Sequence, residues 1–416
     1  MSRLLSLVRP GLYSAACFYL LAQTQPVSEQ SSQVYAWGLG TSGQLGLGSE
    51  ASRGLPTLIK ELEAVQVLKV GSSGYCNAST ALTRHGRIFT WGSGIDGILG
   101  VNEDDSNLLI PTLIERLPGH NFTKVVSGGG HMAALNSEGR LFTWGLDNDG
   151  QLGHQPEEKN TNSKFYKPTF FKGGKPPGPV AGPLAAKRVV DVDCGRYFSA
   201  AVTEEGEVYT WGAGRDFALG HGDRANKHSP TLVEGLAGEK VIKIACGKNF
   251  CVALSASGSV FSWGNNDLGQ LGITKADRCK ELPTKLTTLV DVVDVSAGDL
   301  HVLALTRSGQ VYSWGNGADG QLGHANTANQ FSPKLIQSVP QIAKVACGGG
   351  HSAFITADFS LLMCGRGRDG QLGRQARAEN VAGPKTTPIA VDTFGGSKVL
   401  DVACGVDHTL AVTIPK

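Results

Sequence analysis

The feature that most constrains the fold of this chain is a unit of about fifty residues that recurs seven times. Its first string reads VYAWGLGTSGQLG at residues 34–46, and it returns six times, ending with LLMCGRGRDGQLG at 361–373. All six tryptophans of the chain occupy one slot of this string, and Cys364 occupies the seventh copy of the slot. Successive slots lie 50 to 54 residues apart, except for one interval of 67. A fixed period of this length is typical of propellers, solenoids and other repeat arrays.

A second string precedes each return of the first, as in VVSGGGHMAALNSEG at residues 125–139. It holds a short alternation of apolar residues, a polar turn that usually includes glycine, and another alternation that ends at the tryptophan slot. This pattern indicates a β-hairpin, and no part of the unit has a sustained helical period. Four short strands per unit fit a propeller blade. We therefore predict an all-β fold, a seven-bladed β-propeller spanning residues 31–416.

The two ends of the repeat array distinguish a closed ring from an open rod. The last copy of the second string, at residues 402–413, lacks the partner strand that follows every earlier copy. The first copy of the first string, from Val34, lacks the strand that precedes the others. If residues 409–413 pair with residues 33–37, the ring closes and leaves no open sheet edge. A solenoid needs capping repeats, which neither end resembles, so we expect a ring closed by the N- and C-terminal strands.

The Trp-Gly…Gly-Gln-Leu-Gly string and the Cys-Gly-x-x-His string together resemble the regulator of chromosome condensation repeat family. The resemblance covers residues 34–413 and includes all seven copies. It implies a seven-bladed propeller whose partner is chosen by surface side chains. The best-known member is a nuclear exchange factor for the small GTPase Ran, with a wedge on its third blade that inserts near the nucleotide.

Composition is that of a globular protein, and cysteine usage favours a reducing compartment, or at least the absence of a disulfide framework. The chain is 41% hydrophobic and 18% charged, and its net charge of +2 gives no general tendency to bind polyanions. Four of its nine cysteines share one repeat slot, at Cys194, Cys246, Cys347 and Cys404. Equivalent slots lie on different blades, so we expect buried small residues here and no disulfide framework.

Residues 1–30 differ in character from the repeats. They carry Arg3, Arg9, several serines and no acidic residue before Glu29, a composition typical of a mitochondrial presequence. The apolar run at 11–22 also suits a secretory signal, although it is too short to span a bilayer and no clear cleavage site follows. An uncleaved tail is the third alternative. We expect a targeting segment at 1–30 of a mitochondrial protein without a transmembrane segment, with the secretory pathway as the alternative location.

Four copies of the first string match the dinucleotide fingerprint Gly-x-Gly-x-x-Gly, as at Gly38, Gly40 and Gly43. A true fingerprint occurs once, between a strand and a helix. Here the string recurs with no helix after it, which argues against a nucleotide site. Asp147 and Asn266 replace the middle glycine in two other copies. Because Gly, Asn and Asp tolerate positive φ, we interpret the middle slot as a left-handed turn.

Four histidines share one slot, three residues after a repeated glycine: His131, His301, His351 and His408. We align Gly74, Phe198 and Phe250 with this slot in other copies. Phenylalanine can pack but cannot bind a metal, and equivalent points on different blades lie too far apart for one ion, whose bonds to His are about 2.0–2.1 Å. We therefore interpret the slot as packing, with contact to a partner as the alternative, and expect no metal site.

The sequence holds no Gly-x-Ser-x-Gly elbow, His-Glu-x-x-His, phosphate-binding loop or Cys-x-x-Cys. Every conspicuous residue belongs to a repeat slot, which is typical of a scaffold. Catalytic groups can still converge from distant loops. We expect no enzymatic activity, no catalytic residue and no cofactor.

Blade three carries an irregular stretch, because the interval between Trp144 and Trp211 is about 14 residues longer than its neighbours. The excess falls in an insertion at 155–188 that also contains six prolines. A loop that mixes cations and aromatics is a candidate docking arm for RNA, phosphate or an acidic protein. The alternative is a proline-stiffened surface insertion without a partner. Its candidate contact residues are Lys159, Lys164, Phe165, Tyr166, Lys167, Phe170, Phe171, Lys172 and Lys175.

Further candidates vary between copies and lie just before the histidine slot: Arg196, Tyr197, Lys248, Asp299 and Asp407. We expect one face of the ring to display them together. Their mixed charge fits a protein-binding face better than a uniform nucleic-acid groove.

The sequence favours a non-catalytic, monomeric interaction propeller, a scaffold or adaptor for a mitochondrial protein or a ribonucleoprotein subunit. The second hypothesis is a guanine-nucleotide exchange factor for a small GTPase, and the third is an RNA-binding factor. The expanded third blade matches in position the wedge that the resemblance implies. After Trp144, however, the chain keeps the ordinary Asp-Gly-Gln-Leu-Gly turn, and no basic nuclear tail precedes blade one. This favours the scaffold over nuclear exchange.

Overall fold

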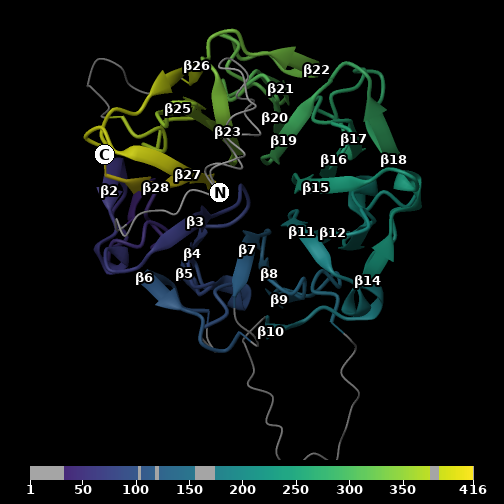
Figure 1. Cartoon of the computed structure of the whole chain (residues 1–416), viewed down its shortest axis with the longest axis horizontal. Coiled ribbons are helices and arrows are strands. Elements are labelled where there is room, and N and C mark those ends of the chain that lie inside the picture. Colours follow the sequence, from purple (N-terminus) through teal and green to yellow (C-terminus); the bar gives the residue numbers. More distant parts are fainter. Residues whose placement is uncertain (1–31, 102–104, 118–120, 155–173, 375–383, 416) are drawn as a thin grey trace, which may run out of the picture.

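A computed structural model describes residues 32–101, 105–117, 121–154, 174–374 and 384–415. These residues form seven four-stranded antiparallel sheets, which are arranged as blades around a central axis (Figure 1). The predicted all-β, seven-bladed propeller is confirmed. In each blade the first strand lies innermost, beside the axis, and the fourth lies outermost.

The strands of the first four blades are as follows. Blade one has β27 (Lys398–Cys404), β28 (His408–Ile414), β1 (Gln33–Gly38) and β2 (Arg53–Leu58), and blade two has β3 (Val67–Gly71), β4 (Ala78–Thr83), β5 (Ile88–Gly92) and β6 (Leu108–Leu113). Blade three has β7 (Phe122–Ser127), β8 (His131–Asn136), β9 (Leu141–Gly145) and β10 (Lys175–Pro179), and blade four has β11 (Val189–Cys194), β12 (Phe198–Thr203), β13 (Val208–Gly212) and β14 (Lys227–Leu232).

The remaining blades follow the same order. Blade five has β15 (Val241–Cys246), β16 (Phe250–Ser255), β17 (Val260–Asn265) and β18 (Cys279–Leu286), and blade six has β19 (Val292–Ala297), β20 (His301–Thr306), β21 (Val311–Gly315) and β22 (Gln330–Leu335). Blade seven has β23 (Ile342–Cys347), β24 (His351–Thr356), β25 (Leu361–Gly365) and β26 (Lys385–Ala390). Short 3-10 turns lie between strands at η1 (Lys60–Leu62), η2 (Ile95–Gly97), η3 (Gly182–Ala186), η4 (Arg215–Phe217) and η5 (Glu234–Leu236).

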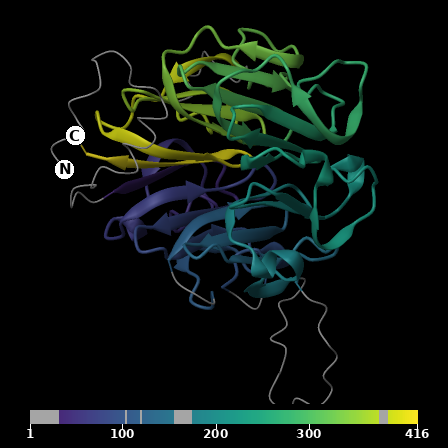
Figure 2. The same ribbon diagram turned by 45° about the vertical axis from the view of Figure 1, so that its right-hand side comes forward.

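Blade one joins the two ends of the chain. Its strand order is β2-β1-β28-β27, and β1 pairs with β28 in an antiparallel register that runs from Gln33 opposite Thr413 to Trp37 opposite Thr409. The purple and yellow ends of the chain therefore lie side by side in both views (Figures 1 and 2). The predicted closure by N- and C-terminal strands is confirmed.

The tryptophan slot joins each blade to the one before it. The six tryptophans are fully buried, and the indole Nε1 of Trp91 donates to the carbonyl oxygen of Gln44 at 3.0 Å. Trp314 makes the same contact with Gln270 at 3.0 Å. A Cβ added to Gly46 would lie 2.7 Å from Nε1 of Trp91, and Gly46 has a φ of +68°. The Gln-Leu-Gly end of one blade thus receives the tryptophan of the next, and only glycine fits there.

The middle glycine of the fingerprint-like string is not left-handed, so this interpretation was wrong. Among the described residues with positive φ are Gly38 (+105°) and Gly43 (+78°), but not Gly40, Asp147 or Asn266. A Cβ on Gly40 would lie 2.5 Å from the carbonyl oxygen of Ala51. Glycine at position 40 therefore allows a close approach of two backbone segments and does not serve an unusual φ.

Candidate functional site

The antiparallel blades give the ring two different faces. The loops that join first to second strands, such as 128–130 and 195–197, lie on the same face as those that join third to fourth strands, such as 213–226. We call this the loop face. The hairpin turns between second and third strands and the connections between blades form the other face, the hairpin face.

The histidine slot is buried between blades. All four histidines are fully buried, and Nε2 of His131 lies 2.9 Å from the hydroxyl of Ser199 in the next blade. That hydroxyl donates in turn to the carbonyl oxygen of Gln151 at 2.8 Å. Burial lowers the pKa of His131 to about 4, so the ring is neutral at physiological pH. Three further pairs repeat this contact: His301 with Ser352, His351 with Thr409, and His408 with Ser79. The packing interpretation is confirmed.

Blade two departs from the alignment that we made for this slot. The slot is the first residue of the second strand, which in blade two is Ala78 and not Gly74. The loop before it runs over residues 72–77, whereas the corresponding loop of blade three runs over 128–130. Three extra residues therefore moved the slot, and the assignment of Gly74 was wrong.

These extra residues form a loop across the mouth of the central channel. In this Tyr75 loop (residues 72–77), the hydroxyl of Tyr75 donates to the carbonyl oxygen of Gly298 in blade six at 3.1 Å. The hydroxyl of Ser73 donates to the carbonyl oxygen of Gly128 in blade three at 3.3 Å. A Cβ added to Gly74 would lie 3.1 Å from the backbone nitrogen of Gly349 in blade seven. The loop thus reaches blades three, six and seven and closes the channel at the loop face.

The cysteine slot lines the wall of the channel below the Tyr75 loop. Cys194, Cys246, Cys347 and Cys404 all border one cavity of about 210 Å³, and burial raises the pKa of Cys347 to about 12. The eight cysteines within the described residues are free thiols. Protonated, buried thiols of this kind are inert, so the slot is structural.

The five predicted loop-face candidates all lie in loops between first and second strands, and Asp299 lies against Gly74 of the Tyr75 loop. The backbone nitrogen of Lys248 donates to the carbonyl oxygen of Asp299 at 3.1 Å. Burial raises the pKa of Asp299 to about 7, although Lys248, Arg366 and Arg196 oppose this shift. Asp407 is buried and accepts hydrogen bonds from Arg366 at 3.0 Å and from Gln371 at 3.2 Å. Its carboxylate is therefore occupied within the fold, while Arg196, Tyr197, Lys248 and Asp299 are half-buried.

Blade four has an unusual residue on the loop face that was not predicted from the sequence. Phe217 has a φ of +61°, a conformation that costs a side-chain-bearing residue about 1–2 kcal/mol. The six other blades have glycine in this slot, each with positive φ: Gly43, Gly97, Gly150, Gly269, Gly320 and Gly370. The signal was present in the repeat alignment as the only non-glycine at this position.

Phe217 belongs to a cluster of cations and aromatics. The guanidinium carbon of Arg224 lies 4.5 Å from the ring centroid of Phe217, and those of Arg196 and Arg215 lie 5.1 and 5.9 Å from the ring of Tyr197. We call these five residues the blade-four patch. Arg215 and Arg224 are exposed, and the other three are half-buried. Arginine and tyrosine are enriched at the energetic centres of protein interfaces.

The predicted insertion is shorter than 155–188, because β10 and η3 occupy residues 175–186 as ordinary parts of blade three. Lys175 begins β10, and its Nζ forms an ion pair with Asp147 at 2.7 Å. The other candidates of the insertion, from Lys159 to Lys172, lie outside the described residues.

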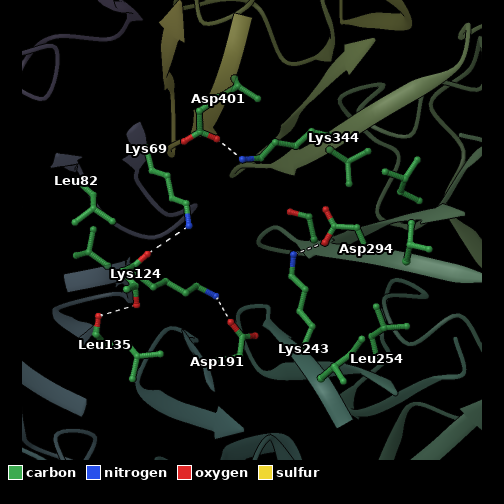
Figure 3. A pocket seen from close by; sticks show the side chains of 18 of the residues that line it. Lys69, Leu82, Lys124, Leu135, Asp191, Lys243, Leu254, Asp294, Lys344 and Asp401 are labelled. Carbon is green, nitrogen blue, oxygen red and sulfur yellow. Dashed lines mark hydrogen bonds and ion pairs between the residues drawn. The ribbon is translucent and has the colours of Figure 1, made fainter. Parts of the chain in front are cut away.

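The opposite end of the channel, at the hairpin face, opens into a cavity of about 590 Å³. One charged residue from each blade lines it (Figure 3): Asp401, Lys69, Lys124, Asp191, Lys243, Asp294 and Lys344, in blade order. Lys124 pairs with Asp191 at 2.6 Å, Lys243 pairs with Asp294, and Lys344 pairs with Asp401. Each pair joins neighbouring blades. This charged ring was not predicted from the sequence, although its slot recurs in every copy.

Comparison with known proteins identifies the family. A model of the RCC1-like domain matches residues 96–415, and a model of the regulator of chromosome condensation (RCC1) repeat matches residues 31–79. The chain belongs to the RCC1-like domain family. This RCC1-like propeller is 33% identical over 388 residues to the mouse E3 ubiquitin-protein ligase HERC2, covering 92% of this chain but 8% of that protein.

Two plant relatives are closer to this chain in length. The mitochondrial RCC1 domain-containing protein RUG3 of Arabidopsis thaliana is 33% identical over 70% of this chain and 63% of its own. The ultraviolet-B receptor UVR8 of the same plant is 33% identical over 76% of this chain and 68% of its own. The chain thus spans a small part of HERC2 and just under two thirds of RUG3.

Solved structures of RCC1-like propellers share the fold. Human WBSCR16 superimposes with a TM-score of 0.79 at 23% identity, covering 92% of this chain and 99% of that one. Prp20p of Saccharomyces cerevisiae, described with its binding properties to Gsp1p and histones, superimposes with a TM-score of 0.77 at 24% identity over 94% and 93% of the two chains. Within the described residues of our chain, no helix has the length and apolar character needed to cross a membrane.

Proposed function

We propose that this RCC1-like propeller is a non-catalytic scaffold that binds an acidic protein partner through the blade-four patch of its loop face. The observation that carries the proposal is Phe217. A strained, bulky residue in a slot that suits glycine persists only where something compensates for its cost, and such strain is concentrated at functional sites. The surrounding arginines supply the positive charge that an acidic partner would meet.

The residues that recur from blade to blade have structural roles, which leaves the blade-four patch for the choice of a partner. The tryptophans, histidines and cysteines of the repeat are buried and make contacts between blades or line the channel. Residues that specify the fold in this way are not available to select a partner. Blade four instead presents three arginines and two aromatics outside these slots.

The substitution Phe217→Gly tests the proposal directly. Glycine removes the backbone strain, so the melting temperature should stay the same or rise, while recovery of the partner should fall. Affinity purification from isolated mitochondria, followed by quantitative mass spectrometry, measures the second effect. Arg196→Glu and Arg224→Glu should reduce the same partners, whereas Arg140→Glu, an exposed arginine on the hairpin face, should not.

An unchanged partner set in Phe217→Gly and in both charge reversals would show that the patch does not bind the partner. Partners that disappear after nuclease treatment would favour the RNA-binding hypothesis instead. Deletion of residues 155–173 in the same experiment tests the predicted docking arm separately, because it leaves the patch unchanged.

We also propose a mitochondrial location, supported by the composition of residues 1–30 and by the mitochondrial relative RUG3. Full-length chain incubated with energised mitochondria should become protected from protease and shorter, and a chain lacking residues 2–30 should remain outside. Asn77-Ala78-Ser79 and Asn121-Phe122-Thr123 match the acceptor sequence for N-glycosylation. Import into endoplasmic-reticulum microsomes with glycosylation at either asparagine would identify the secretory alternative.

Guanine-nucleotide exchange is the second candidate. The connection between β9 and β10 covers residues 146–174, whereas that between β13 and β14 covers 213–226, so the connection in blade three is the longer one. Release of fluorescent GDP from small GTPases of the same compartment, measured with and without the purified propeller, tests this activity. No acceleration with any of them would eliminate the exchange hypothesis.

A further inference from the structure

The charged ring at the hairpin face exists because every innermost strand has the same irregularity. In each first strand the register with the second strand shifts just before the charged residue, for example between Val67 and Lys69 in blade two and between Val189 and Asp191 in blade four. A β-bulge of this kind re-aims side chains. The seven charged side chains therefore meet around the channel, as Figure 3 shows for their blades.

An odd number of blades prevents perfect alternation of charge around this ring. Following the blades in order, positive and negative residues alternate except at one place, where Lys69 of blade two is followed by Lys124 of blade three. Lys124 pairs with Asp191 at 2.6 Å. On the other side of Lys69, Asp401 pairs with Lys344 and also accepts a hydrogen bond from the backbone nitrogen of Val70 at 2.9 Å. Both neighbours of Lys69 are thus already engaged.

Lys69 is left as the excess cation of the ring. Its Nζ donates to the carbonyl oxygen of Thr123 at 3.3 Å, and it has no carboxylate within ion-pair distance among the residues that the structure describes. It is exposed, whereas the three paired lysines are partly buried. The side chain points into the cavity (Figure 3). Four lysines and three aspartates give the ring one surplus positive charge.

The walls of the cavity are largely apolar beyond the charged ring. Val190, Ile242, Val293 and Ala343 border it, each one position before a charged residue, and Val190 and Ile242 are 43% and 45% exposed. The Tyr75 loop lies across the other end of the channel, and the cavity lies at the hairpin face. Its volume of about 590 Å³ falls in the usual range for small-molecule sites.

We propose that this cavity binds a small monocarboxylate with an apolar body, whose carboxylate pairs with Lys69 and whose body contacts the apolar wall. One surplus charge matches one carboxylate. A phosphate dianion would exceed the surplus and would be repelled by the three aspartates of the ring. An uncharged ligand of the same shape would leave Lys69 without a counter-ion.

Calorimetric titration of the full-length protein with octanoate tests the proposal, with octanol and octyl phosphate as the comparison ligands. Octanoate should bind with one-to-one stoichiometry and at least about tenfold more tightly than either comparison ligand, because only it makes a matched charge-assisted contact. Binding of octyl phosphate that equals or exceeds that of octanoate would overturn the assignment to a monocarboxylate.

Variants of Lys69 locate the site. Lys69→Met should weaken octanoate binding at least about tenfold without lowering the melting temperature, because this lysine has no ion pair to lose. Lys69→Arg should retain binding, and Lys60→Met, an exposed lysine on η1 near the start of blade two, should have no effect. Octanoate that binds Lys69→Met as tightly as the unaltered protein, or that shows no binding to the unaltered protein, would refute the site. These outcomes are independent of the loop-face proposal.

Discussion

At the scale of single residues, the histidine slot is matched to the residue that it faces in the next blade. His131 of blade three faces Ser199 of blade four. In blade four the slot holds Phe198, and blade five has Cys251 at the position equivalent to Ser199. Where the slot holds Phe250 in blade five, the equivalent position of blade six is Val302, and where it holds Ala78 in blade two, that position of blade three is Met132. A polar slot thus meets a hydroxyl, and an apolar slot meets an apolar or sulfur-bearing residue. The pairing gives Nε2 of each slot histidine a hydrogen-bond partner in the next blade.

Ser199→Ala should destabilise the fold by about 2 kcal/mol, because it leaves both Nε2 of His131 and the carbonyl oxygen of Gln151 without a partner in a buried site. Urea unfolding followed by circular dichroism measures the change. Cys251→Ala is the matched control at the equivalent position of the next blade, where the slot holds Phe198, and should cost clearly less. Equal losses would mean that the histidine–hydroxyl contact contributes nothing of its own.

The buried histidines also make stability depend on pH. The pKa of His131 falls to about 4 in the fold, against about 6.5 in the unfolded chain. The contribution of His131 to the free energy of unfolding is nearly constant above pH 7. As the pH falls from about 6.5 towards 4, protons bind the unfolded chain and this contribution is lost. Between pH 7.5 and 5.5 the loss is about 1 kcal/mol for each such histidine.

The variant His131→Phe, which copies the residue of blades four and five, isolates this effect. Its stability should fall by about 1 kcal/mol less than that of the unaltered protein over the same pH interval. The comparison is needed because Asp299, with its pKa raised to about 7, contributes with the opposite sign. Parallel pH profiles for the two proteins would contradict the assignment of a neutral, proton-excluding His131.

At the scale of elements, β1, the strand that closes the ring, makes contacts within blade one and with blade seven. β1 lies between β28 and β2, and Trp37 packs in one apolar cluster with residues of blade seven such as Met363 and Leu372. Its indole also donates to the carbonyl oxygen of Gln371 at 2.8 Å. One strand thus completes a sheet and joins the last blade to the first.

A chain that begins at residue 38 should melt about 5–10 °C lower than one that begins at residue 32, which keeps β1 and serves as the control. The loss of Trp37 alone removes a fully buried side chain, and the loss of the strand exposes an edge of β28 that promotes aggregation. Thermal melting with light scattering measures both effects. Identical melting curves would show that closure by β1 does not stabilise the ring.

At the scale of the whole molecule, the parts of the fold that could be predicted are those that the repeat expresses along the chain. The period and the unpaired strings at the two ends were sufficient for the blades and for ring closure. The Tyr75 loop was not predictable, because Tyr75 meets Gly298 across the channel, 223 positions away. The charged ring was missed because the bulge before Lys69 interrupts the strand alternation that sequence patterns rely on.

The candidate site was predicted less completely than the fold, for the same physical reason. The shared face of Arg196, Tyr197, Lys248 and Asp299 was predictable, because equivalent loops lie on one face, while their contact with a partner stays a prediction. It could not show that Asp407 is occupied by Arg366, since that contact joins two blades. Phe217 could have been found, because a single non-glycine in a left-handed slot is visible in the repeat alignment.

Because the tryptophans lie at the contacts between blades, intrinsic fluorescence can report the separation of neighbouring blades. Each of six junctions holds one buried indole, so separation of two blades there exposes a fluorophore to water. The junction between blades six and seven differs, because Cys364 replaces the indole and its sulfur lies 3.5 Å from the carbonyl oxygen of Gln321. A ring that opened at this junction would do so without exposing an indole, and intrinsic fluorescence would report an intact protein.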